Sequence, residues 1–247
     1  MNPLFDLCYE TNKKGTLVLL DVALISHLSN FADFSRSELK EFIGQAHAKR
    51  VKKNDSFFVE GEAAHSFFLL LDGYIRVVRI SGSGEQIIVR YIASNELFGI
   101  ASAIGRDTYP ANAVAAIDCV ALSWPMPLWN ETVRRFPSFA KAASTTLGNR
   151  FADVQDRVLE LATEQVEHRV AAALLKLLEQ TGRETDEGVL IDIPLTRQDV
   201  SEMSGTTLHT VSRLLSGWEQ SGLVKSSRKK VIVTDKTKFT NLYSVQK

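Results

Sequence analysis

The spacing of hydrophobic residues changes along the chain and predicts first helices, then strands. Over residues 22–47, apolar residues recur at steps of three and four, which is typical of amphipathic helices, and Ser35 with Glu38 has the spacing of a capping box. Over residues 48–126, short runs of β-branched and aromatic residues are separated by turn residues such as Asp72 and Gly73. These runs predict strands at 57–59, 67–71, 74–80, 86–92 and 113–124. Several short strands at this spacing indicate a β-barrel, roll or sandwich.

A second helical region is predicted from 128 to 161, and Pro137 fits the start of its longer part. The apolar residues of that part alternate steps of four and three, which is typical of a coiled-coil seam. They are Leu147, Phe151, Val154, Val158 and Leu161. Either a second copy of the chain or another part of the same chain can cover this stripe. Because the stripe is narrow and the other helix faces are polar, we favour a homodimer.

Residues 162–247 have the pattern of a compact last region. An amphipathic helix is predicted over 164–180 and a short strand over 189–193, and two helices and a small hairpin follow. The chain therefore divides into an N-terminal region at 1–127, a helical region at 128–162 that carries the seam, and a C-terminal region at 163–247.

The interval 197–216 carries the spacing of a helix-turn-helix. Thr196 and Asp199 form a capping-box pattern before a short helix, and Thr207 can cap a second one. Between them, Gly205 stands where the turn needs a positive φ. The inward positions of the two helices are apolar, namely Val200, Met203, Val211, Leu214 and Leu215. A small residue at Ser201, a glycine four later and a branched residue six after that complete the motif.

The outward residues of the second helix would face base edges in a major groove. They are Leu208, His209, Ser212 and Arg213. Arg213 can donate two hydrogen bonds to a guanine, although a phosphate contact or a surface salt bridge is the alternative. A further set is suited to phosphates and includes the tip of a basic wing, namely Arg197, Thr206, Thr207, Arg228, Lys229 and Lys230.

Net charge alone does not indicate a nucleic-acid partner, because 29 Lys and Arg balance 29 Asp and Glu over 247 residues. The local balance differs: between Thr196 and Thr240, eight basic residues stand against four acidic ones. Such a cluster is what phosphate contacts require, and a solvated basic face is the alternative.

Cysteine use and hydropathy indicate a cytoplasmic protein without a membrane partner. The two cysteines, Cys8 and Cys119, are far apart in sequence, which fits a reducing compartment. No apolar run is long enough to cross a bilayer, and no signal-peptide pattern precedes residue 21. An enzyme of the cupin type would need clustered metal ligands in the strand region, which the sequence does not offer, so we expect no enzymatic activity.

Taken together, these motifs resemble the Crp/Fnr superfamily of bacterial regulators over nearly the whole chain. The residues that carry the resemblance are Gly61-Glu62, Asp72-Gly73, Phe98-Gly99, the seam at 147–161 and the motif from 195–199 through 210–213. The resemblance implies an α+β fold with an N-terminal β-roll (double-stranded and jelly-roll-like), a long dimerisation helix and a C-terminal winged helix-turn-helix. It also implies a homodimer, a palindromic operator on double-stranded DNA, and activation through contact with RNA polymerase.

Within the family motif, Arg213 matches the guanine-reading arginine and Ser212 a base-contacting serine of the Fnr-like branch. His209 stands where the family usually has glutamate. A carboxylate accepts from a cytosine amine, whereas an imidazole can donate or accept, so the base read at this position is open.

The resemblance also bears on what controls the protein. Cyclic-nucleotide members carry a glutamate after Phe-Gly and an Arg-Ser pair, but here the effector-pocket residues are Phe98, Gly99, Ile100, Tyr109 and Pro110. Neither Ile100 nor the Tyr109-Pro110 pair can replace that cassette, so no cyclic nucleotide is expected. Two cysteines cannot supply the roughly four thiolates of an iron–sulfur cluster.

Residues 109–113, Trp124-Pro125 and 206–213 resemble the nitrogen-oxide-responsive branch, and this similarity implies nitric oxide sensing through haem and control of denitrification genes. His168 is the candidate haem ligand, and no other metal site is expected. The alternatives are another small molecule, a redox change involving Cys8 and Cys119, or activity without an effector.

Overall fold

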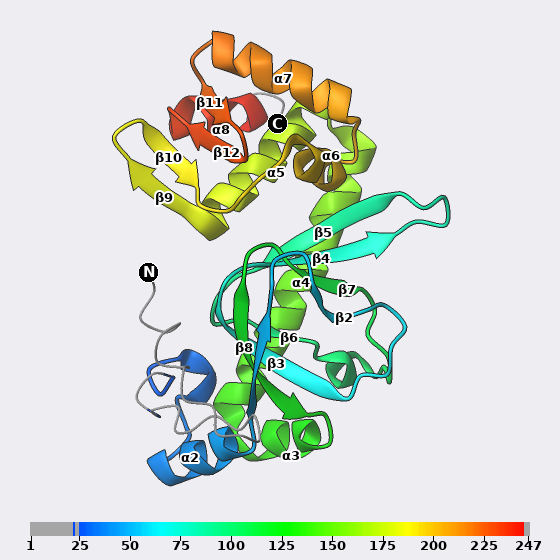
Figure 1. Ribbon diagram of the computed structural model, residues 1–247, viewed down its shortest axis with the longest axis vertical. Helices are drawn as coiled ribbons and strands as arrows, with labels where there is room; N and C mark the ends of the chain where they lie inside the picture. The colour runs from blue at the N-terminus through cyan, green and yellow to red at the C-terminus, as the bar shows by residue number, and fades with distance from the viewer. Residues whose placement is uncertain (1–21, 23–24, 245–247) are drawn as a thin grey trace. The chain divides into compact units, whose positions relative to one another are not determined.

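The computed structural model describes residue 22 and residues 25–244 (Figure 1). Cys8 and residues 23–24 of the expected N-terminal helices lie outside this part. Two compact units are present: Met1–Ile75 with Ile92–Ala152, and Arg76–Tyr91 with Asp153–Lys247. The backbone therefore passes from one unit to the other three times.

The first unit begins with short helical elements, as the pattern predicted. They are the 3-10 turn η2 (Ser29–Phe31) and helix α2 (Arg36–Gly44). The predicted capping box of α2 is confirmed, because Ser35 Oγ accepts from Glu38 N at 3.3 Å while Ser35 N donates to Glu38 Oε2 at 3.0 Å. Helix does not extend to residue 47, however. His47 starts an edge strand whose mostly polar side chains gave no strand pattern.

The strands of the β-roll form two four-stranded sheets. The first has the order β1 (His47–Val51), β8 (Cys119–Pro125), β3 (Ser66–Asp72), β6 (Leu97–Phe98). The second has the order β2 (Ser56–Phe58), β7 (Asn112–Ala115), β4 (Ile75–Ile80), β5 (Gln86–Ile92). In the first sheet β3 and β8 run antiparallel, with Leu69 opposite Leu122.

The strand predicted at 113–124 was wrong as a single element. It is two strands, β7 and β8, in different sheets, and the chain turns between them. That turn is held by hydrogen bonds: Ala116 N donates to Tyr74 O at 2.8 Å, and Lys53 N donates to Asp118 Oδ1 at 2.8 Å. A 3-10 turn, η3 (Ala101–Ile104), was also not predicted.

The core of the first unit lies where strands β3 and β8 meet the helices. Phe67 and Trp124 are fully buried and stack with ring centroids 5.6 Å apart, and Trp124 Nε1 donates to Phe42 O at 2.8 Å. Helices α3 (Leu128–Arg135) and α4 (Pro137–Thr163) add Trp129 and Phe139 to this cluster. The N-terminal part of α4 is thus anchored in the unit's core.

The second unit contains the C-terminal elements and the β4–β5 hairpin. Its helices are α5 (Val166–Thr181), α6 (Arg197–Ser204), α7 (Leu208–Gln220) and α8 (Lys236–Ser244). Its four-stranded sheet has the order β11 (Val224–Ser227), β12 (Lys230–Val233), β10 (Gly188–Ile191), β9 (Gly182–Thr185). Strand β9 and helix α8 were not predicted. The fully buried Phe239 of α8 packs edge-on against Trp218 of α7, with centroids 5.0 Å apart.

Candidate nucleic-acid interface

Helix α6 begins and ends where the sequence predicted. Thr196 caps it: its Oγ1 accepts from Asp199 N at 3.0 Å, and Asp199 Oδ2 accepts from Thr196 N at 2.8 Å. Gly205 ends it in the left-handed conformation with φ 62°, and its N–H donates to Ser201 O at 3.0 Å. The backbone turn between the two helices of the motif is therefore built from these local signals.

Helix α7 follows after one further cap. Thr207 Oγ1 accepts from Thr210 N at 3.2 Å. Val211 and Leu215 are buried, as predicted, and Trp218 continues the same stripe at 4% exposure. The sequence reading missed Trp218, although its step of three from Leu215 was the available signal. Two predicted inward residues, Met203 and Leu214, are only half-buried.

The opposite face of α7 presents the residues assigned to base edges. Leu208, His209 and Arg213 are exposed, and Ser212 is half-buried. Positions 208 and 212 are four residues apart, as are 209 and 213, and 209 and 212 are three apart. The four positions therefore share one helix face. An aliphatic, an imidazole, a hydroxyl and a guanidinium are therefore displayed together.

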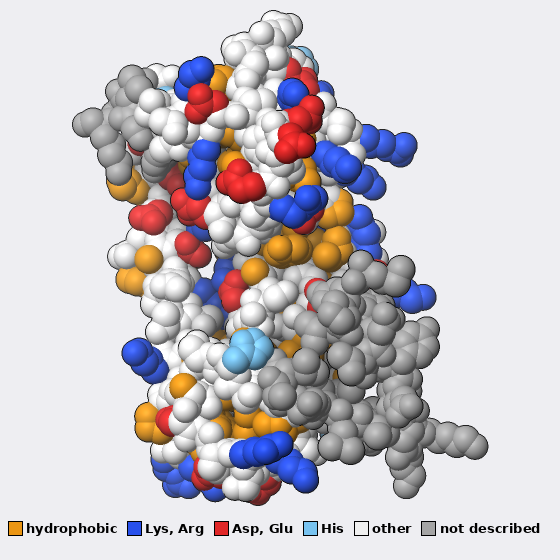
Figure 2. Space-filling view, turned by 90° about the vertical axis from the view of Figure 1, so that its left-hand side faces the viewer, with side chains coloured by type: hydrophobic (Ala, Val, Ile, Leu, Met, Phe, Trp, Pro, Cys, Tyr) orange, Lys and Arg blue, Asp and Glu red, His pale blue; other side chains and the backbone are white. Residues whose placement is uncertain are grey.

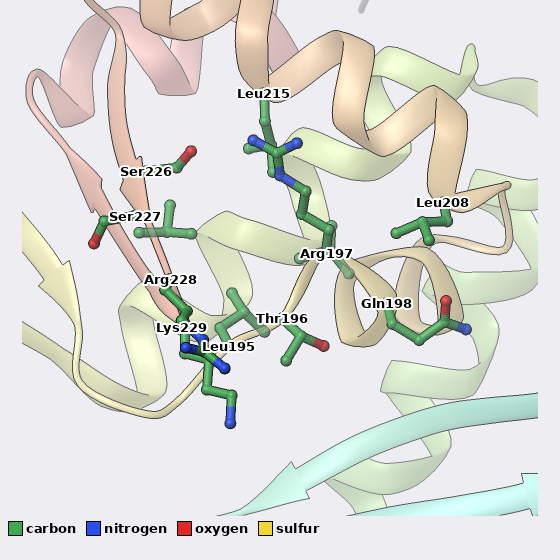
Figure 3. Close-up of a pocket in the computed structure, with 12 residues that line it drawn as sticks. Leu195, Thr196, Arg197, Gln198, Leu208, Leu215, Ser226, Ser227, Arg228 and Lys229 are labelled. Carbon is green, nitrogen blue, oxygen red and sulfur yellow. The ribbon is translucent and has the colours of Figure 1, made fainter.

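A groove of about 520 Å³ runs beside this helix, and its walls combine cations with apolar residues. Arg197 and Gln198 come from the start of α6, Leu208 from the start of α7, and Arg228 and Lys229 from the wing (Figure 3). The other lining residues are Leu195, Thr196, Val200, Leu215, Ser226, Ser227 and Val231. Three of the six predicted phosphate residues are thereby brought to one groove, whereas Thr206, Thr207 and Lys230 do not line it.

The wing is the β11–β12 hairpin, and Lys230, which was predicted at its tip, lies in a strand. Ser226, Ser227 and Lys230 belong to the strands, so Arg228 and Lys229 alone form the turn. Lys229 has φ 64°, which a side-chain-bearing residue rarely adopts, and its carbonyl accepts from Leu195 N at 3.2 Å. This bond ties the basic turn to the segment that enters α6.

The predicted seam on α4 is largely uncovered within the chain. Phe151, Val154, Val158 and Leu161 are exposed by 64%, 52%, 63% and 50%, and only Leu147 packs against the chain's own core. Contiguous exposed apolar side chains on one helix usually mark an interaction surface.

Two sequence families match the chain in separate segments. Residues 168–242 match the Crp-like helix-turn-helix domain, and residues 48–136 match the cyclic nucleotide-binding domain. The chain belongs to the Crp/Fnr family of transcription regulators. Crp/Fnr regulators bind DNA and are not enzymes.

Relatives of this Crp/Fnr protein cover most of its length. It is 26% identical to the global nitrogen regulator of Synechococcus elongatus over 198 residues, which is 79% of this chain and 89% of that protein. It is 29% identical to the cyclic AMP receptor protein of Thermus thermophilus over 168 residues, 68% of this chain and 74% of that protein. The structure of FixK2 from Bradyrhizobium japonicum shares the fold with a TM-score of 0.70 at 20% identity, covering 80% of this chain and 96% of that one. The β-roll, long helix and C-terminal helix-turn-helix are the fold that the sequence predicted.

In this Crp/Fnr chain the predicted effector-pocket residues are mostly enclosed. Phe98, Ile100 and Tyr109 are buried, and Pro110 is half-buried. Gly99 has φ 65°, and a Cβ there would lie 2.8 Å from the ring of Phe68.

Tyr109 is itself fully engaged. Its ring stacks on Phe58 with centroids 3.8 Å apart, and its hydroxyl donates to Ser66 O at 2.7 Å and accepts from Ser66 N at 3.2 Å. Burial raises the pKa of the Tyr109 hydroxyl. This position of the predicted effector pocket therefore holds a neutral phenol whose hydrogen bonds are satisfied within the chain.

His168 and Cys119 are both buried. His168 lies on α5 with 9% exposure, and its Nδ1 is 3.1 Å from Glu164 Oε2. Burial raises the pKa of the Cys119 thiol to about 11.

No helix among residue 22 and residues 25–244 is long and apolar enough to span a membrane.

Proposed function

We propose that this Crp/Fnr regulator binds a palindromic operator as a homodimer and reads each half-site with α7. The observation that carries the proposal is the exposed face of α7 beside a groove lined by three cations. A helix of this kind fits a major groove, and flanking cations neutralise phosphates on either side.

Each side chain has a proposed role that follows from its chemistry. Arg213 donates to the O6 and N7 acceptors of a guanine, while His209, Ser212 and Leu208 contact neighbouring base edges. Phosphate contacts position the helix without specifying sequence. We assign them to Arg197, Thr206, Thr207, Arg228, Lys229 and Lys230.

The proposed dimer pairs along the α4 stripe. Its support is the exposure of Phe151, Val154, Val158 and Leu161 within a single chain, together with the homodimer that the family resemblance implies. We further propose that residues 1–127 sense the effector, residues 128–162 form the dimer contact and residues 163–247 read the DNA. We also propose a contact with RNA polymerase, through which the protein acts as an activator.

The proposed effector is nitric oxide, and the proposed targets are denitrification genes; both rest on the sequence resemblance. Against a cyclic nucleotide stand the buried Ile100 and the engaged hydroxyl of Tyr109. His168 does not fit a haem in this structure, because its side chain is buried on α5 with only 9% exposure. We therefore derive no step through haem and keep another small molecule, a redox change or constitutive binding as alternatives.

Selection of bound duplexes from a random pool tests the proposal. We expect a palindromic consensus, and we expect Arg213→Ala to lose about 1–3 kcal/mol of discrimination between consensus and random DNA. Arg183→Ala is the matched control, since Arg183 is an exposed arginine of the same unit, paired with Asp192 at 2.9 Å. Parallel selections with a nitric oxide donor, with haem plus the donor, and with a thiol oxidant separate the effector alternatives.

Failure would be plain in two ways. A wild-type protein without any sequence preference in all arms would overturn the operator proposal. Equal weakening of Arg213→Ala on consensus and random DNA would make Arg213 a phosphate contact only.

A further inference from the structure

The β4–β5 hairpin contacts the first helix of the DNA-reading motif. Residues Arg76–Tyr91 belong to the same compact unit as α6, although Ile75 and Ile92 on either side belong to the other unit. In Figure 1 the two long strands of this hairpin lie next to α6. The chain therefore leaves the first unit at residue 76, contacts the helix-turn-helix, and returns to the first unit at residue 92. A segment in this place can influence the position of α6.

The main contact is an ion pair between Arg76 and Asp199. Arg76 Nη1 lies 2.8 Å from Asp199 Oδ1, and the two side chains are only 18% and 7% exposed. The other carboxylate oxygen, Oδ2, is the one that accepts from Thr196 N at 2.8 Å and Thr196 Oγ1 at 2.6 Å. The two oxygens of Asp199 therefore have different partners: Oδ2 takes part in the N-terminal cap of α6, and Oδ1 forms the ion pair with Arg76 of the hairpin.

A second bond joins the same pair of elements one turn further along. Gln86 Nε2, at the start of β5, donates to Glu202 Oε2 at 2.8 Å. Tyr91, near the end of β5, interacts with the same charged groups. Burial together with the negative charge of Asp199 raises the pKa of its hydroxyl. Both strands of the hairpin thus contribute side-chain contacts to α6, and the buried part of the contact is charge-assisted.

We propose that Arg76 is a positioning residue for DNA reading: through Asp199 it fixes α6, and with it the groove that Arg197 shares with α7. Arg76 also balances a buried carboxylate two residues from Arg197. Without it, an uncompensated negative charge remains close to where phosphates must bind, and α6 loses the buried, charge-assisted part of its contact with the hairpin. The Thr196–Asp199 cap needs no arginine, so α6 itself stays formed.

The test uses the full chain and a consensus duplex obtained by selection, so it rests on the proposed operator binding. We expect Arg76→Gln to raise the dissociation constant for the consensus about tenfold, within the usual range for coupling between two sites. Arg76→Lys keeps the charge and should recover part of the loss. Arg183→Gln removes an exposed ion pair of the same unit and should bind like wild type.

Hydrogen exchange separates positioning from a merely structural role. Because coupling is reciprocal, operator DNA should increase the protection of amides 76–91 in the wild type. In Arg76→Gln that response should vanish while amides of α7 remain protected by DNA. Gln86→Ala, which leaves the buried pair intact, is the second variant and should weaken the response without abolishing it.

The outcomes are distinct. If selection with the wild-type protein gives no consensus duplex, the proposed function is wrong, and the affinity comparison of the Arg76 variants is not made. A consensus bound equally by Arg76→Gln and wild type, or a hairpin whose exchange ignores DNA in the wild type, would overturn the role of Arg76.

Discussion

Among single residues, Cys119 illustrates how position in the fold determines side-chain chemistry. It lies in β8 with 1% exposure, and the single proton of its Sγ has two acceptors within reach, Tyr74 O at 3.3 Å and Ile117 O at 3.2 Å. Gly73 faces it so closely that a Cβ there would lie 2.6 Å from the sulfur. Because water cannot solvate a thiolate at this place, burial raises the pKa of the thiol to about 11.

This pKa predicts a thiol that resists alkylation in the folded protein. At pH 8, three units lower, about one thiol in a thousand is ionised, and the thiolate is the reactive form. We expect iodoacetamide to label Cys119 far more slowly in the native protein than in guanidinium chloride, followed by mass spectrometry of its peptide. Below pH 11 the native rate should rise as pH rises. Native labelling as fast as in the denatured chain would contradict the buried, protonated thiol.

The residues of the interface differ in how far sequence could reveal them. Arg213 and His209 follow from local spacing, because a helix places residues three and four apart on one face. The pairing of Arg76 with Asp199 could not be predicted, since 123 residues separate the partners and nothing local distinguishes Arg76. Likewise the enclosure of Tyr109 depends on Ser66 and Phe58, which only the folded sheets bring near.

At the scale of elements, the correct predictions are those with strong local periodicity or a cap. The capping boxes of α2 and α6 and the αL glycine at Gly205 were each found where expected. Strands β1, β6 and β9 were missed. β1 and β9 are edge strands whose side chains are mostly exposed or half-buried, so alternation of apolar residues is missing from their sequences, and β6 has only two residues. Helix α8 is short, and over residues 236–242, whose burial is described, only Phe239 is buried, which is too little for a periodic signal.

Two glycines of the helix-turn-helix should respond oppositely to the same substitution. Gly205→Ala forces a Cβ into φ 62° and within 3.0 Å of Arg157 Nη2, and should lower the free energy of unfolding by about 1–2 kcal/mol. Gly217→Ala lies within α7, where a Cβ meets no atom within 4 Å, and should raise it by about 0.5–1 kcal/mol. Urea unfolding measures both, and each variant is the control for the other. The same sign in both variants would contradict the left-handed turn.

At the scale of the whole molecule, charge and apolar surface are distributed differently. On the face drawn in Figure 2, acidic and basic side chains are interspersed over the surface, in keeping with 29 residues of each sign. The apolar stripe of α4, by contrast, is confined to one side of one helix. Interspersed charges of both signs do not single out a partner, whereas a narrow stripe of exposed Phe, Val and Leu at coiled-coil spacing is typical of pairing with another helix.

The stripe predicts that assembly and operator binding fail together. Fully burying a Val, Leu or Phe side chain contributes about 1.5–3 kcal/mol, so glutamates at Phe151 and Val154 should remove much of the pairing energy and add repulsion across a two-fold axis. We expect the double variant Phe151→Glu/Val154→Glu to show the 27.5 kDa mass of one chain by light scattering, against twice that value for the wild type. Since a monomer engages only one half-site, its affinity for the palindrome should fall to that for a single half-site.

Leu159→Glu is the matched control, because Leu159 is as exposed, at 62%, but lies off the stripe on the same helix. It should leave both the dimer mass and the operator affinity unchanged. If the double variant keeps the mass of a dimer, α4 does not pair the chains through this stripe. If it becomes a monomer yet binds the palindrome as tightly as the wild type, the two half-sites are not read together, and the exposed side chains of α4 serve another partner.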